Sequence, residues 1–323
     1  MNYIYIYTKG AAGFVGRLLH ILLTLSLLLS LLTLPAGCSG QEPTLRIGVM
    51  PDLDSIPLMA AKQAGYLPDA IILEVYKSPT ERDSALYSGH LDGAVSDLLA
   101  AFLAADSGED YKALTVTDGC YKLVAAAHTD IRTPAALTGK TLGLSLHTII
   151  EYAADRMLLA AGIEPASVQK QAVPSIPVRL ELLKAGKLDA AVLPEPYASE
   201  AVNSGGHLLA SSADQELDAG LLLFSGKAFS EKPNLLAALI QGYNRAAAAL
   251  REGRGGWEDA AAALGLPNAL TAGQLPAYRD AALPGEQDLE EAARWLTQGR
   301  LLSQPPQTTN ILGDLKGLMQ SHG

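Results

Sequence analysis

The sequence predicts an α/β protein built from two similar lobes, and three observations carry that prediction. Short apolar segments alternate with helical ones after residue 44, which is typical of parallel sheets covered by helices. A pattern of residues recurs 97 positions further along the chain. The chain has 323 residues, 49% of them hydrophobic, which is enough for two domains or one two-lobed body.

The predicted strands fall into two sets of three, at residues 45–49, 71–76, 91–95, 141–145, 168–172 and 190–193. Ser78, Pro79 and Glu81 place a capping hydroxyl, a proline and an acidic residue at the start of a helix. We therefore expect a helix that runs to Ser88 and that Gly89 ends.

The repeated pattern links the two sets of strands. Seven identities, each spanning 97 positions, are Arg82/Arg179, Leu86/Leu183, Gly89/Gly186, Leu91/Leu188, Asp92/Asp189, Ala94/Ala191 and Val95/Val192. This spacing is too long for a solenoid repeat and fits one helix-turn-strand unit used once in each lobe. We predict a first lobe from 45–128 and 215–323, and a second from 129–214. Helical stretches at 233–251 and 288–296 are expected to pack on the first lobe.

The front of the chain is typical of an export signal. Lys9 and Arg17 precede a largely apolar run at 18–34, and Pro35-Ala36-Gly37-Cys38 follows. Small residues before a cysteine resemble a bacterial lipobox, although Pro35 stands where a leucine is usual. We expect a signal peptide at 1–37, lipidation of Cys38 and a linker at 38–44. The alternative is an uncleaved membrane anchor, because the run is close to the minimum length for spanning a membrane.

Composition argues against several classes of function. A net charge of −10 disfavours binding to nucleic acid. With two cysteines and six scattered histidines, neither a disulfide framework nor a zinc site is expected. The glycines of 10–16 imitate a dinucleotide fingerprint, but no acidic residue follows about 20 positions later, so we expect no nicotinamide cofactor, and no cofactor of any other kind.

Five segments resemble a known family, at 50–57 (MPDLDSIP), 65–67 (GYL), 80–86 (TERDSAL), 91–97 (LDGAVSD) and 193–197 (LPEPY). They are similar to the nitrate/sulfonate/taurine and thiamine-precursor group of ABC transporter substrate-binding proteins, and the resemblance covers most of 45–302. The last segment departs from the family's Trp-Glu-Pro pattern, because Leu193 and Pro194 precede Glu195. The resemblance implies a two-lobed fold of the periplasmic-binding-protein type II class, with a hinge and an interlobe cleft. It also implies an extracytoplasmic solute carrier that serves a permease and an ATPase.

Ligands of open α/β sheets bind beyond the carboxyl ends of the strands, so the residues that follow each strand are the binding candidates. They are Asp52, Asp54, Ser55, Ser96, Asp97, Ser145, His147, Thr148 and Glu195.

The charges of these candidates leave two classes of ligand open. Ser145, His147 and Thr148 stand at a predicted helix N-terminus, which suits a sulfonate- or nitrate-like anion, but no arginine accompanies them. The four carboxylates instead favour a cation or a heteroaromatic amine. Asp and Ser at these places are also ordinary helix caps.

An enzyme is the alternative function. Thiamine-degrading enzymes share a related fold, and by that analogy Cys120 would be the nucleophile, with Glu195 or Asp97 as its base. A lone cysteine is more often a small buried hydrophobe. We therefore expect a binding protein with no catalytic residues and no metal, held on the outer face of the membrane by a lipid. A monomer is expected, and a sensor that presents its closed form to a receptor is a third reading.

Overall fold

The computed structural model describes residues 43–215, 217–267 and 270–320, and 44–323 form one compact unit. The predicted signal peptide (1–37), Cys38 and most of the linker at 38–44 lie outside the described residues. No helix within the described part has the length and apolar character needed to cross a membrane.

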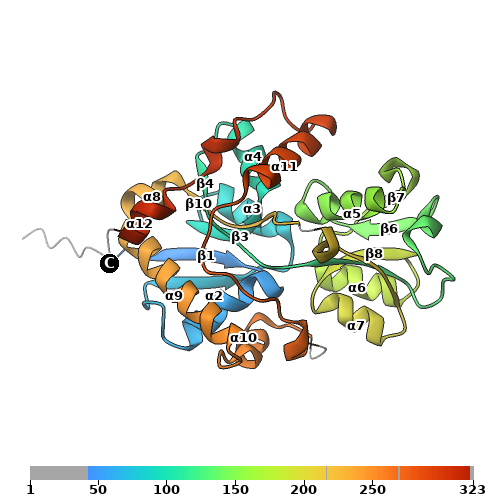
Figure 1. Ribbon diagram of the computed structural model, residues 1–323, viewed down its shortest axis with the longest axis horizontal. Helices are drawn as coiled ribbons and strands as arrows, with labels where there is room; N and C mark the ends of the chain where they lie inside the picture. Colours follow the sequence, from blue (N-terminus) through green and yellow to red (C-terminus); the bar gives the residue numbers. More distant parts are fainter. Residues whose placement is uncertain (1–42, 216, 268–269, 321–323) are drawn as a thin grey trace, which may run out of the picture. The chain divides into compact units, whose positions relative to one another are not determined.

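Two five-stranded sheets, one in each lobe, form the compact unit (Figure 1). Their orders are β2-β1-β3-β10-β4 and β7-β6-β8-β5-β9, and in each the fourth strand is antiparallel to its neighbours. The predicted α/β fold of two similar lobes is therefore confirmed. The strands are β1 (Leu45–Val49), β2 (Ile71–Val75), β3 (Gly93–Asp97), β4 (Tyr111–Val116), β5 (Tyr121–Ala125), β6 (Thr141–Leu144), β7 (Gln169–Ala172), β8 (Ala190–Pro194), β9 (His207–Ser211) and β10 (Gly220–Ser225).

Helices cover both faces of each sheet. The C-terminal helices pack on the first lobe as predicted, with α9 and α10 against α2 and with α11 against α4 (Figure 1). The helices are α2 (Ile56–Gln63), α3 (Pro79–Tyr87), α4 (Leu98–Asp106), α5 (Ile149–Ala160), α6 (Ile176–Lys184), α7 (Tyr197–Asn203), α8 (Gly226–Glu231), α9 (Pro233–Arg251), α10 (Trp257–Leu264), α11 (Glu286–Gln298) and α12 (Leu315–Gln320).

The repeated helix-turn-strand unit has the same structure in both lobes. Gly89 and Gly186 each turn the chain with a left-handed φ, of 75° and 67°. The carboxylate of Asp92 accepts the backbone N–H of Arg46, and that of Asp189 accepts the N–H of Thr141, both at 2.8 Å. Each aspartate thereby fixes the start of the neighbouring strand. Because residues 91 and 92 serve this turn, β3 begins at Gly93 rather than at residue 91 as predicted.

Within the described residues the chain crosses between the lobes at 117–120 and again between β9 and β10, and each crossing delivers the antiparallel strand of the sheet that it enters. The sheet order places β5 in the second sheet, so the predicted boundary at 128/129 falls too late. Arg279 joins the two crossings. Its side chain donates hydrogen bonds to Asp118 (2.5 Å) and to Asp218 (2.5 and 3.0 Å).

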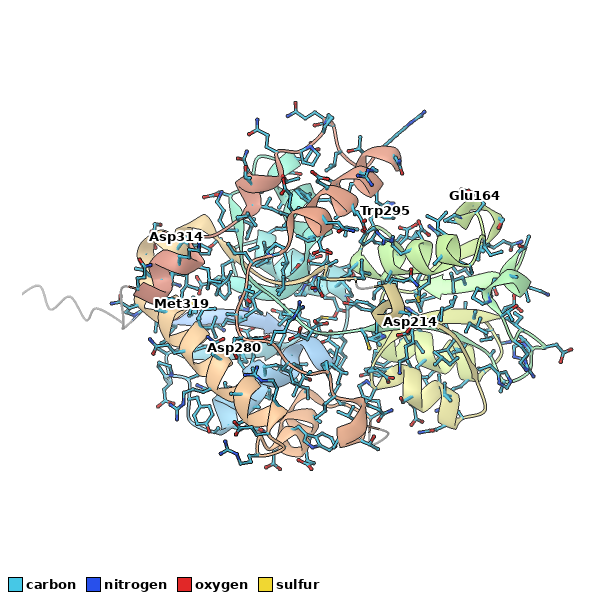
Figure 2. The ribbon with its side chains drawn as sticks, in the orientation of Figure 1. Glu164, Asp214, Asp280, Trp295, Asp314 and Met319 are labelled. Carbon is cyan, nitrogen blue, oxygen red and sulfur yellow. The ribbon has the colours of Figure 1, made fainter. Side chains whose placement is uncertain are left out.

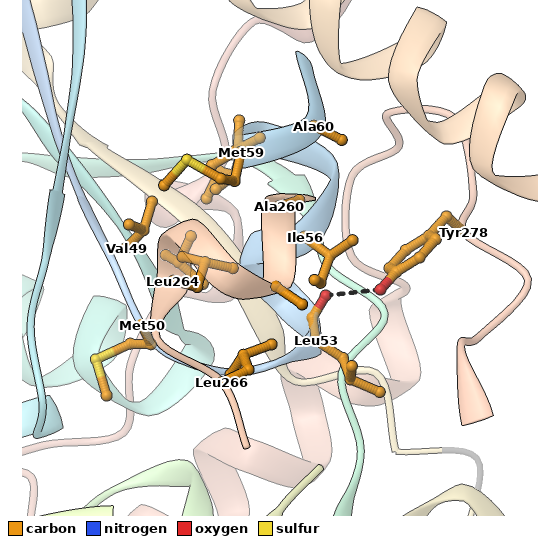
Figure 3. Close-up of a cluster of buried hydrophobic side chains, with 14 of the residues drawn as sticks. Val49, Met50, Leu53, Ile56, Met59, Ala60, Ala260, Leu264, Leu266 and Tyr278 are labelled. Atoms are coloured by element: carbon orange, nitrogen blue, oxygen red, sulfur yellow. Dashed lines mark hydrogen bonds between the residues drawn. The ribbon is translucent and has the colours of Figure 1, made fainter. Parts of the chain in front are cut away.

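A buried apolar cluster fixes the turn that follows β1 (Figure 3). Leu53 and Ile56 at this turn belong to the same cluster as Leu264 and Leu266, at the end of α10 and just after it. The Tyr278 hydroxyl also donates a hydrogen bond to the carbonyl oxygen of Leu53 at 3.0 Å. The apolar cluster and the Tyr278 hydrogen bond therefore hold the turn that carries Asp52 and Asp54 in place.

Candidate functional site

The turn after β1 presents two buried carboxylates. Asp52 caps the short 3₁₀ turn Leu53–Ser55 and accepts hydrogen bonds from the N–H (3.3 Å) and hydroxyl (3.1 Å) of Ser55. Asp54 accepts the N–H of Gly119, in the first crossing, at 2.7 Å. Burial raises the pKa of both carboxyls, and the charge of Asp54 raises that of Asp52 further. The two carboxyls therefore share a strong tendency to hold a proton.

Asp97 is the last residue of β3 and is also buried. It caps α4 by accepting the N–H of Ala100 at 2.9 Å, and Nη2 of Arg82 lies 3.9 Å from its Oδ2. Burial raises the pKa of Asp97 to about 6, against the opposing charge of Arg82 and the hydrogen bonds from the N–H groups of Ala100 and Ile149. Asp97 lines the same cavity as Thr148, the residue before α5, so this carboxyl lies beside the second lobe.

The turn after β6 contributes Ser145, His147 and Thr148. Thr148 caps α5, accepting the N–H of Ile150 at 3.2 Å and donating to the carbonyl oxygen of Ser145 at 2.9 Å. His147 is exposed, with a left-handed φ of 58°, and its N–H donates to Glu151 at 2.7 Å. This loop has the geometry of a helix N-terminus and brings no cationic side chain of its own.

Glu195 lies after β8 and is 1% exposed. Its carboxylate forms an ion pair with Lys122 of β5 and accepts the N–H and hydroxyl of Ser199 at 3.0 Å. Its peptide bond to Pro196 is cis. Lys122 therefore neutralises Glu195 within the protein. The sequence did not indicate this pair, because 73 positions separate the two residues.

The carboxylates converge on the region between the lobes. The charges of Asp54, Asp52 and Asp97 all act on buried Tyr121, whose pKa burial and these charges raise well above its usual value. Asp52 also acts on Tyr197 of α7, whose pKa is raised to about 12 mainly by burial. First-lobe carboxylates thus lie close to aromatic rings of β5 and α7 in the second lobe.

A cavity of about 310 Å³ lies between the lobes, lined by Asp97 and Tyr87 of the first lobe and by His147 and Thr148 of the second. The buried hydroxyls of Ser96 and Ser145 have no hydrogen-bond partner among the described residues, which is rare in proteins, but neither residue lines this cavity.

Cys120 lies in the first crossing, partly buried beside a second cavity of about 490 Å³ that Lys122, Gln274 and Arg279 also line. Burial raises the pKa of the thiol to about 11. The thiol is therefore protonated at neutral pH, which opposes a nucleophilic role.

Of the residues predicted for the site, Asp52, Asp54 and Asp97 act through their charges on Tyr121, and Asp97, His147 and Thr148 line the cavity between the lobes. Ser55 turns inward instead, with its hydroxyl accepting the N–H of Met50 at 2.9 Å, and His147 lies at the rim. No group of three or more potential ligands within the described residues is placed to hold a metal ion.

Comparisons with known proteins agree with this architecture. Residues 39–265 match the model of the NMT1-like family, and a search of the curated proteins gives no match. The ligand-binding component of an ABC-type import system from Staphylococcus aureus, with zinc bound, has a TM-score of 0.72 and 15% identity, covering 87% of this chain and 99% of that one.

Two further solved structures have the same fold. The alkanesulfonate-binding protein SsuA from Xanthomonas axonopodis pv. citri, bound to MOPS, has a TM-score of 0.71 and 20% identity over 83% of this chain and 96% of that one. The desulfurization enzyme DszB, in complex with biphenyl-2-sulfinic acid, has a TM-score of 0.64 and 17% identity over 87% and 99%. These likenesses confirm the periplasmic-binding-protein fold, and the match of residues 39–265 to the family model confirms the family resemblance seen in the sequence.

Proposed function

The chain belongs to the NMT1-like family, and from that premise we propose that it is the extracytoplasmic substrate-binding lipoprotein of an ABC importer. It captures one small polar solute between its lobes and delivers it to a permease and an ATPase. Two lobes connected by crossing strands, with polar strand ends facing one another, suit hinge closure around a ligand.

One observation supports the choice of solute more than any other. Three buried carboxylates of the first lobe, Asp52, Asp54 and Asp97, lie close enough to Tyr121 to perturb it. A carboxyl that holds a proton can transfer it to a basic amine on binding, and tyrosine rings attract the resulting cation, so these groups favour an organic cation or a protonated heteroaromatic amine. The solute is therefore cationic or heteroaromatic, of the thiamine-precursor kind. A sulfonate- or nitrate-like solute is the second possibility, supported by the N-terminus of α5.

The decisive experiment identifies the solute. Native mass spectrometry of protein purified without denaturation is expected to find one small molecule per chain, and calorimetry with that compound should give 1:1 binding without turnover. Asp54→Asn should lower the affinity for a cationic ligand by at least about tenfold. Asp314→Asn is the matched control, because Asp314 lies far from the cleft (Figure 2). Unchanged affinity in Asp54→Asn would show that the carboxylates do not select a cation.

The lipid anchor is a separate part of the proposal, and it rests on the sequence around Cys38. Cells expressing the protein are labelled with radioactive palmitate, and the expected result is a labelled band that disappears in Cys38→Ala. An unlabelled wild-type protein would point to a cleaved or uncleaved segment without lipid.

An enzyme is the second candidate, because DszB shares the fold. In that case Cys120 would act as nucleophile, and Cys120→Ala would abolish turnover of the retained compound. The raised pKa of the Cys120 thiol speaks against this mechanism. A binding protein predicts instead that Cys120→Ala leaves the affinity for the retained compound unchanged.

A further inference from the structure

His147 has a backbone conformation that needs support. Its φ of 58° is left-handed, which a non-glycine residue adopts only where its surroundings hold it. The support is a hydrogen bond that its N–H donates to Oε2 of Glu151 at 2.7 Å. Because His147 lines the cavity between the lobes, Glu151 helps to fix the loop at the rim of the cleft.

Lys170 of β7 connects Glu151 to the next turn of α5. A glutamate near a helix start commonly accepts an N–H from the preceding backbone, so the contact with His147 alone is ordinary capping. Capping does not require Lys170, whose Nζ lies 2.7 Å from Oε1 of Glu151 and 2.7 Å from Oδ1 of Asp155. The two carboxylates are four residues apart on one face of α5, and without the lysine between them they would repel each other.

Asp155 carries this connection to the first lobe. Its Oδ2 accepts the indole N–H of Trp295 at 3.0 Å, and Trp295 belongs to α11, which packs against α4 of the first lobe. The side chains of Glu151, Asp155 and Lys170 are 10%, 9% and 19% exposed, so water and salt screen their charges little. A chain of short polar contacts therefore runs from α11 to the backbone of His147.

A cavity of about 700 Å³ lies beside this chain, and it separates part of α11 from the second lobe. The five members of the chain line it, namely His147, Glu151, Asp155, Lys170 and Trp295. Because the lobes are not closely packed here, the contact between Trp295 and Asp155 can form and break without repacking of an apolar core. A gap bridged by a few side chains suits a contact that changes as the lobes open and close.

We propose that Lys170 is a positioning residue: it couples the lobe contact of Trp295 to the conformation of His147, so that closure on the α11 side shapes the rim of the cleft. Loss of the lysine separates the two carboxylates and leaves each end of the chain to move by itself. The inference rests on the proposed function, because closure matters only if the protein binds between its lobes. Its test uses protein without added solute, so that the two can fail separately.

The test changes one end of the chain and measures the other. Hydrogen exchange of the His147 amide is followed by NMR in heavy water. Trp295→Phe should raise the exchange rate at least about threefold, although it removes no hydrogen bond of His147. Lys170→Met should raise it at least about tenfold, and in that background Trp295→Phe should add less than about twofold. Lys170→Arg, which can pair with both carboxylates, should restore slow exchange and the response to Trp295→Phe.

Glu291→Gln is the matched control. Glu291 of α11 forms an ion pair with Arg156 of α5, so it joins the same two helices outside the chain of Lys170. This variant should change the exchange rate of the His147 amide by less than about twofold. An equal rise in Glu291→Gln and in Trp295→Phe would mean that any loosening between the lobes frees the loop, and it would overturn the inference.

Circular dichroism and thermal unfolding establish that each variant is folded before exchange is measured. Unchanged exchange in folded Lys170→Met, or a full effect of Trp295→Phe in that background, also overturns the inference. Absence of coupling in a protein that still holds its solute 1:1 refutes the role of Lys170 alone. Coupling in a protein that binds no solute of any kind refutes the proposed function alone.

Discussion

Arg82 and Arg179 perform the same structural task in the two lobes. Nη1 of Arg82 donates to the carbonyl oxygen of Val95 at 2.8 Å, and Nη1 of Arg179 donates to that of Val192 at 2.7 Å. Both arginines are buried, and each clamps its helix to the strand that leads to the cleft. The two halves of the fold therefore share a buried arginine clamp as well as a topology.

The two clamps differ in their partners. Arg82 faces Asp83 and Asp97, which raise its pKa, whereas among the described residues Arg179 has only the carbonyl oxygens of Val173, Pro174 and Val192 as acceptors. Burial lowers the pKa of Arg179 to about 9. The first lobe thus pairs its arginine with carboxylates, whereas the second lobe pairs its arginine with backbone carbonyl oxygens alone.

Arg179→Lys is expected to destabilise the protein by about 2–3 kcal/mol, because a lysine cannot reach all three carbonyl oxygens and leaves buried acceptors without donors. Urea unfolding measures the change. Arg132→Lys, at an exposed arginine, is the control and should change the unfolding free energy by less than about 0.5 kcal/mol. Equal stability of the two variants would mean that the Arg179 clamp is dispensable.

The stability of the protein should depend on the buried carboxyls. Burial raises the pKa of Asp52 to about 8 and that of Asp97 to about 6, so the folded protein keeps protons that the unfolded chain loses near pH 4. Their contribution is complete below about pH 4 and is lost as the pH rises through 6 and then 8, at about 1.4 kcal/mol per pH unit for each proton.

Urea unfolding of the wild type and of Asp52→Asn between about pH 5 and pH 8 tests this dependence. The unfolding free energy should fall more steeply with rising pH in the wild type than in Asp52→Asn, because the variant has lost one of the raised groups. Parallel curves would mean that Asp52 has an ordinary pKa in the folded protein.

Trp295 should control affinity without touching the cleft. It lies in α11, which packs on the first lobe, and its indole N–H donates to Asp155 of α5 in the second lobe at 3.0 Å (Figure 2). Its ring also contacts Tyr152, with the ring centres 5.6 Å apart. Trp295→Phe removes the hydrogen bond between the lobes, which is worth about 1 kcal/mol, and should weaken the retained solute about fivefold.

The matched control is Trp257→Phe, in α10 of the first lobe, which packs on the core without bridging the lobes. It should lower the unfolding free energy and leave the affinity unchanged. The same loss of affinity in both variants would indicate a general loss of stability. Unchanged affinity in Trp295→Phe would mean that the contact of α11 with the second lobe does not contribute to ligand binding.

Cys120 should behave as an ordinary protonated thiol. Because its pKa is raised to about 11, iodoacetamide should modify it much more slowly than it modifies free cysteine at neutral pH. The reaction is followed by mass spectrometry in a Cys38→Ala background. Rapid modification at neutral pH would reveal a thiolate and would favour an enzyme over a binding protein.

The sequence was sufficient for the parallel strands and the duplication, since both depend on local pattern. Residues 45–49 form β1 within the predicted bounds, and the turns at Gly89 and Gly186 follow from one repeated motif. The strands β4, β5, β9 and β10 were not predicted, because short apolar segments such as LLLF at 221–224 do not reveal their partners. Only long-range pairing decides that β5 enters the second sheet and β10 the first.

For the site, the sequence indicated which acidic residues follow the strands, but not which of them are neutralised by a basic side chain. Asp52, Asp54 and Asp97 were predicted from their places after strands, and the structure buries all three. Lys122 was missed as the partner of Glu195. Their ion pair depends on β5 lying beside β8 in the second sheet, and no local pattern reveals that pairing across 73 positions.

Titration of the retained solute into Asp54→Asn, beside the wild type, is the most direct measurement of whether the buried carboxyls select the solute. The account requires the solute to bind this variant at least about tenfold less tightly than the wild type. A folded variant that keeps its full affinity for the solute would contradict the account.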